Sequence, residues 1–121
     1  MKQIKLYDSE LKLMELIWQQ KELTTAKQIS LIASEVIGWN KNTTYTVLKK
    51  LVTKGAINRI EPNFICEPLI TREQVQLDET RKLIDKLYDG SLKTFFASFL
   101  KKEHLSQEEI TELKDIIDKE F

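Results

Sequence analysis

One segment, residues 41–54, limits the possible folds of this sequence more than any other. It carries the start and stop signals of a helix, because Asn40 is a good N-terminal cap and Gly55 stands where helices commonly end. At about 100° per residue, one arc of this helix gathers apolar residues and one threonine. The arc consists of Thr44, Val47, Leu48, Leu51 and Val52. Such an arc has to be buried, so the helix must pack against a core.

Helices are expected before this segment and a hairpin after it. The first helix runs from about residue 8 to residue 20 with Asp8 as its cap, and the second begins at a Thr-x-x-Gln capping box at Thr25. Two short strands, 56–60 and 64–66, with a turn between them are then expected. Helix, helix, helix, hairpin is the order of a winged helix–turn–helix, so the predicted fold class is mainly α with a small β component.

Three more amphipathic helices are expected in the remainder of the chain. Capping boxes at Thr71 and Ser106 and the Gly90-Ser91 pair mark their ends. We therefore divide the chain into a winged head, 1–70, and a three-helix region, 71–121.

A region of 51 residues is too small to bury so many apolar side chains by itself. A twofold partner is therefore expected to cover them and make a homodimer. The alternative is that these helices pack back on the head. The expected dimer contacts are Leu83, Leu87, Leu92, Phe95, Phe96, Phe99, Leu113, Ile116 and Ile117.

Composition argues against several classes of function. A single cysteine, Cys66, and a single histidine provide neither a disulfide framework nor a metal site, so no metal or cofactor is expected. With three glycines there is no glycine-rich phosphate loop, and no nucleophile or paired-acid motif stands out, so an enzyme is not expected. Residues 1–5 lack the apolar stretch of a signal peptide, and no run is long enough to enter a membrane; we expect a cytoplasmic protein.

The net charge of zero hides an asymmetry between the two halves. Residues 1–70 hold ten Lys or Arg against seven Asp or Glu, whereas residues 71–121 hold nine against twelve. No acidic residue lies between Glu35 and Glu61. The outward face of helix 41–54 therefore carries only lysines and short polar groups, which suits a helix lying in the major groove of DNA. The expected DNA contacts are Lys41, Asn42, Thr43, Tyr45, Thr46, Lys49, Lys50 and Thr53 on the helix and Arg59 on the hairpin.

Other interpretations of the same features remain open at this stage. The helix face could be an ordinary solvated surface, although such faces usually mix Glu with Lys. The winged head could serve as a protein–protein interaction module without DNA, because fold does not fix function. The hairpin could be purely structural, since its turn is short and carries Glu61.

The helix 41–54 and its flanks resemble a known family. The run WNKNTTYTVLKKLVTKG, residues 39–55, is similar to the W-S-x-x-T-V-x-T-L-L-x-R-L-x-x-K-G segment of the BlaI/MecI/CopY family of penicillinase, methicillin-resistance and copper-responsive repressors. Glu10, Met14 and Trp18 match its E-x-x-x-M-x-x-x-W pattern. Residues 68–73 resemble its P-L-[IV]-[ST]-x-[ED] junction, and residues 87–91 resemble L-[FY]-G/D-G-S, so the likeness spans almost the whole chain.

This resemblance implies a homodimeric transcriptional repressor that binds an inverted-repeat operator. The copper branch uses a CxC…CxC motif, which is absent here, so copper sensing by that route is not expected. The penicillinase branch is released by proteolysis at an Asn–Phe bond, which implies a membrane sensor-protease pathway as a partner. Ser98-Phe99 occupies that position with a changed first residue, so cleavage here stays open. Lys50 stands where the family usually has Arg, and Asn42 where it often has Lys, so base preference is expected to differ.

Overall fold

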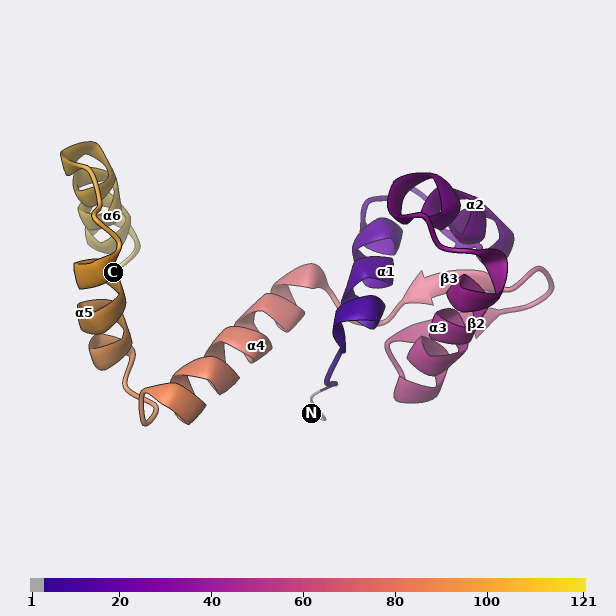
Figure 1. Cartoon of the computed structure of the whole chain (residues 1–121), viewed down its shortest axis with the longest axis horizontal. Coiled ribbons are helices and arrows are strands. Elements are labelled where there is room, and N and C mark those ends of the chain that lie inside the picture. The colour runs from indigo at the N-terminus through magenta and orange to yellow at the C-terminus, as the bar shows by residue number, and fades with distance from the viewer. Residues whose placement is uncertain (1–3) are drawn as a thin grey trace. The chain divides into compact units, whose positions relative to one another are not determined.

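The computed structural model of the chain describes residues 4–121 and confirms a mainly helical fold with a small sheet (Figure 1). The elements are α1 Asp8–Trp18, β1 Thr24–Thr25, α2 Ala26–Ile37, α3 Lys41–Lys54, β2 Ile57–Ile60, β3 Ile65–Pro68, α4 Arg72–Leu87, α5 Leu92–Lys102 and α6 Gln107–Glu120. The chain divides into two compact units, one up to Asp78 and one from Glu79 to Phe121. The division falls inside α4, and the domain boundary near residue 70 stays a prediction.

Local capping explains where the helices of the first unit begin. The Asn40 side chain accepts a hydrogen bond from the backbone N–H of Thr43 at 2.8 Å, as expected for the cap of α3. Thr25 and Gln28 form the predicted capping box of α2. The predicted cap at Asp8 is wrong: α1 is capped one residue earlier, because the Glu10 carboxylate accepts the backbone N–H of Tyr7 at 2.8 Å.

The sheet has the order β1-β3-β2, and β3 pairs antiparallel with both neighbours. The segment Thr24–Thr25 forms the short strand β1, in which Thr24 lies opposite Cys66 of β3. The turn of the hairpin is one residue longer than predicted. Both Asn63 and Phe64 have positive φ angles, so β3 begins at Ile65.

The core of the first unit lies where α1, α2, α3 and the sheet meet (Figure 1). It receives the predicted arc of α3, of which only Val52 remains half-buried. Thr44 is tolerated there because its hydroxyl donates to the carbonyl of Asn40 at 3.2 Å. Burial raises the pKa of the Cys66 thiol to about 11, against an opposing effect of the positive charge of Arg59. Cys66 is therefore a protonated core side chain at neutral pH.

The second unit has little interior of its own. Tyr88, Phe96 and Phe99 place their rings 5.2–5.6 Å from the ring of Phe95, so the four side chains form an aromatic cluster. No residue of α5 or α6, both fully described by the structure, is buried. Among residues 4–121, no helix combines the length and apolar character needed to cross a membrane.

Candidate nucleic-acid interface

The exposed face of α3 collects most of the predicted DNA contacts. Seven of them are exposed along α3 and Arg59 is exposed on β2, whereas Tyr45 is half-buried. The seven are Lys41, Asn42, Thr43, Thr46, Lys49, Lys50 and Thr53. No acidic side chain is contributed by the chain from residue 36 to residue 60. The face therefore offers cationic and small polar groups together.

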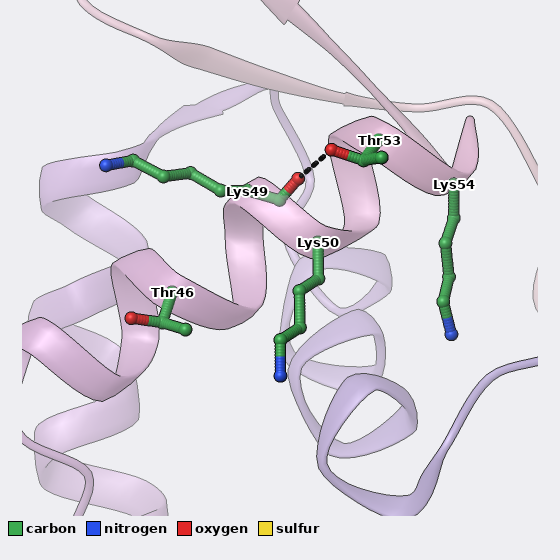
Figure 2. Close-up of a pocket in the computed structure, with 5 residues that line it drawn as sticks. All are labelled: Thr46, Lys49, Lys50, Thr53 and Lys54. Carbon is green, nitrogen blue, oxygen red and sulfur yellow. Dashed lines mark hydrogen bonds between the residues drawn. The ribbon is translucent and has the colours of Figure 1, made fainter.

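A surface hollow on the C-terminal part of this face is lined by Thr46, Lys49, Lys50, Thr53 and Lys54 (Figure 2). Figure 2 shows the lysine at position 49 extending along a different direction from the neighbouring Lys50 and Lys54. The Thr46 hydroxyl donates to the carbonyl of Asn42 at 2.8 Å, and the Thr53 hydroxyl to that of Lys49 at 3.0 Å. Both hydroxyls are thus used within the helix, which leaves the threonine methyl groups for outside contacts.

A chain of aromatic and cationic groups connects the start of α3 to the hairpin. The ammonium group of Lys41 lies 5.8 Å from the centre of the Tyr45 ring, and this ring meets the Phe64 ring edge-on with centroids 6.2 Å apart. The guanidinium carbon of Arg59 lies 3.9 Å from the centre of the Phe64 ring. Such contacts explain why Tyr45 is only half-exposed. They hold the hairpin against α3.

Arg59 has a second partner besides the Phe64 ring. Its Nε donates to the carboxylate of Glu61, two residues further along the turn. The sequence contained a usable signal, because an acid two residues from an arginine at a tight turn is close enough to pair with it. The positive charge expected at this strand is therefore partly neutralised by its own turn.

Lys54 is one of the lysines of α3, but its ammonium group is bound by other groups of the protein. Its ammonium group donates to the Glu10 carboxylate and to the carbonyl of Lys5, and lies 4.4 Å from the centre of the Tyr7 ring. The Glu10 side chain is only 3% exposed. This pair fixes the end of α3 to the start of α1. Sequence patterns did not predict it, because the partners lie 44 residues apart.

The start of α4 is fixed to the same unit by polar contacts. Arg72 donates hydrogen bonds to both oxygens of the Glu15 carboxylate, at 2.9–3.2 Å, and its guanidinium lies near the Trp18 ring. The Trp18 indole N–H donates to the carbonyl of Ile70 at 3.0 Å. In the part of the chain that the structure describes, no cluster of three or more metal-ligating side chains occurs.

Comparisons with known proteins agree with this geometry. The family model described as penicillinase repressor matches residues 6–119. The chain is 30% identical over 113 residues to the penicillinase repressor of Bacillus licheniformis, covering 92% of this chain and 88% of that protein. It is also 30% identical to the methicillin resistance regulatory protein MecI of Staphylococcus aureus, covering 92% of this chain and 91% of that protein.

Two solved structures resemble part of this chain. The solution structure of the DNA-binding domain of the repressor BlaI superposes with a TM-score of 0.54 at 28% identity, over 61% of this chain and 93% of that one. The Bacillus licheniformis BlaI monomer in complex with the blaP half-operator gives a TM-score of 0.51 at 28% identity over the same shares.

The Glu10–Lys54 pair generates a prediction about stability. Replacing the buried carboxylate in Glu10→Gln removes the charge that compensates Lys54 and weakens the cap of α1. Because Lys54 keeps some access to water, we expect a loss of about 1–3 kcal/mol in the free energy of unfolding, below the full cost of breaking a buried pair. Urea denaturation followed by circular dichroism measures it.

Glu15→Gln is the matched control, because it makes the same change in α1 at a half-exposed ion pair. It should cost less than about 1 kcal/mol. Equal losses in the two variants would contradict a special role for Glu10.

Proposed function

We propose that this chain, which belongs to the penicillinase repressor family, represses transcription by binding an inverted-repeat DNA operator as a homodimer. In this proposal α3 lies in the major groove and the second unit joins the two copies. The observation that carries the proposal is the acid-free, lysine-bearing face of α3 in a winged unit. Over 61% of its length the chain is similar to the BlaI monomer whose structure was solved in complex with the blaP half-operator.

Individual side chains receive roles from their chemistry. Lys41, Lys49 and Lys50 neutralise phosphates or donate to guanine, and Asn42 suits adenine, which presents both an acceptor and a donor in the major groove. The methyl group of Thr46 suits the methyl group of thymine, since its hydroxyl is already bonded to the helix. Thr43 and Tyr45 stand at the same end of α3, and Arg59 adds a contact from the hairpin.

The apolar surface of the second unit supports dimerisation. Seven of the nine predicted dimer residues are exposed, and Phe95 and Leu113 are half-buried. Ile117 is 59% exposed and Phe99 is 46% exposed. Apolar side chains exposed together on several helices mark an interaction surface. A second copy related by a twofold axis matches the symmetry of an inverted repeat.

Lys49→Ala tests the role of α3. We expect about 1–3 kcal/mol weaker binding if Lys49 donates to a base, or a uniform loss with a shallower salt dependence if it neutralises a phosphate. Electrophoretic or anisotropy titrations at several salt concentrations separate the two cases. Host genomic fragments selected on the purified protein provide the operator for these titrations.

Lys12→Ala, an equal loss of charge at an exposed position on α1, is the control and should leave binding nearly unchanged. Operator binding by Lys49→Ala that equals the wild type would show that another face of the head meets DNA. Absence of any salt-dependent DNA binding by the wild type would favour the protein-interaction module.

Ile117→Asp tests the dimer. A carboxylate on the apolar face of α6 should shift the protein toward monomer by at least tenfold in dissociation constant, because it would be buried without a partner in the interface. Analytical ultracentrifugation measures the shift. Thr111→Asp introduces the same residue on the opposite side of α6 and should leave the dimer intact. A dimer of wild-type affinity in Ile117→Asp would exclude this face.

Release by proteolysis is the last part of the proposal. Ser98 and Phe99 are both exposed on α5, and cleavage between them would remove Phe99 and all of α6 from the dimer surface. Mass spectrometry of the protein recovered from cells exposed to a β-lactam should then show a fragment ending at Ser98. Intact protein in derepressed cells would exclude this route.

A further inference from the structure

The hairpin holds Arg59 in an unusual setting for a residue that should meet DNA. Its guanidinium stacks on the Phe64 ring, and its Nε donates to the carboxylate of Glu61. The side chain of Arg59 is 44% exposed and that of Glu61 is 62% exposed. The two partners therefore sit at the surface, where a phosphate could reach them.

Phe64 provides a firm platform for this arginine. The Phe64 residue is only 7% exposed, and its carbonyl accepts the backbone N–H of Ala26 at 2.8 Å. Its ring also meets the Tyr45 ring. The Phe64 ring thus gives Arg59 an orienting contact that does not involve the Glu61 carboxylate.

We propose that Glu61 is an intramolecular competitor that occupies Arg59 in the free protein and must be displaced by a DNA phosphate; this inference rests on the proposed DNA-binding function. A carboxylate and a phosphate bind a guanidinium through the same kind of charge-assisted hydrogen bond. If Glu61 stayed in place, two negative groups would share one cation, which is unfavourable. Its exposure leaves it free to swing into water.

The consequence is that the protein binds DNA more weakly but with greater sequence selectivity. Every DNA sequence offers phosphates, so a freely available Arg59 would strengthen binding to all of them alike. Displacing Glu61 subtracts from this uniform contribution. Contacts between α3 and base edges then make up a larger share of the binding energy.

The experiment is a salt series of fluorescence anisotropy titrations with the full chain and mixed-sequence duplex DNA. Glu61→Gln should bind about two- to fivefold more tightly at low salt, the size of one surface ion pair. The plot of log affinity against log salt should steepen by up to about 0.9, the value for one additional phosphate.

Glu67→Gln is the matched control, because Glu67 lies on the same hairpin and, within residues 4–121, its side chain accepts a hydrogen bond from the neutral Asn58 at 3.0 Å and forms no ion pair. Glu67→Gln removes the same charge, and it should give a smaller gain in affinity and no steeper plot of log affinity against log salt. In an Arg59→Ala background, the gain in DNA affinity from Glu61→Gln should fall to the gain seen in this control. Circular dichroism confirms that each variant is folded.

Three results would overturn the proposal. Glu61→Gln could bind no more tightly than Glu67→Gln, could bind more weakly than the wild type, as a positioning role requires, or could keep its gain without Arg59. In each of these cases the wild type still binds DNA, so the proposed function survives. A wild type without salt-dependent DNA binding would overturn both.

Discussion

The buried carboxylate of Glu10 is the constraint on which the arrangement of the head depends. Because burying a charge is costly without partners, this carboxylate requires both the backbone N–H of Tyr7 and the ammonium group of Lys54. The first contact sets where α1 begins, and the second sets where α3 ends relative to it. The orientation of α3 in turn decides which of its side chains face outward. The Glu10–Lys54 pair thus helps to orient the exposed face of α3, on which the proposed DNA binding depends.

Sequence periodicity predicted the helices because each has an apolar arc and a local capping signal. Asn40, Thr25 and Ser106 cap the helices that they were expected to cap, since a cap involves residues only three positions apart. The hairpin and the outward lysines of α3 followed from the same local rules. The family resemblance was also found in the sequence, because its motifs lie in these local elements.

Pairings between distant or turn-related side chains were not predictable in the same way. The Glu10–Lys54 pair joins residues whose proximity depends on the packing of α1 against α3, and nothing in either helix alone indicates it. The turn of the hairpin was predicted one residue short, because Phe64 has a positive φ angle that its residue type does not indicate. The stacking of Arg59 on Phe64 depends on that turn. The sequence therefore predicted which α3 side chains would be exposed, apart from the half-buried Tyr45, but overestimated the free charge on the hairpin.

Among the described residues, few of the predicted DNA contacts are cations without an acidic partner, which gives the second unit a role in the proposed function. Lys54 is held by Glu10 and Arg59 is shared with Glu61, so Lys41, Lys49 and Lys50 are the remaining predicted cationic contacts. A few such contacts give weak, salt-sensitive binding to one half-site. When two heads are joined, the second binds at a high effective concentration and the affinities of the halves combine. When each DNA-binding unit binds weakly and a helical unit joins the two, forming or breaking the dimer contact is enough to change DNA affinity. The groups that touch DNA need not change.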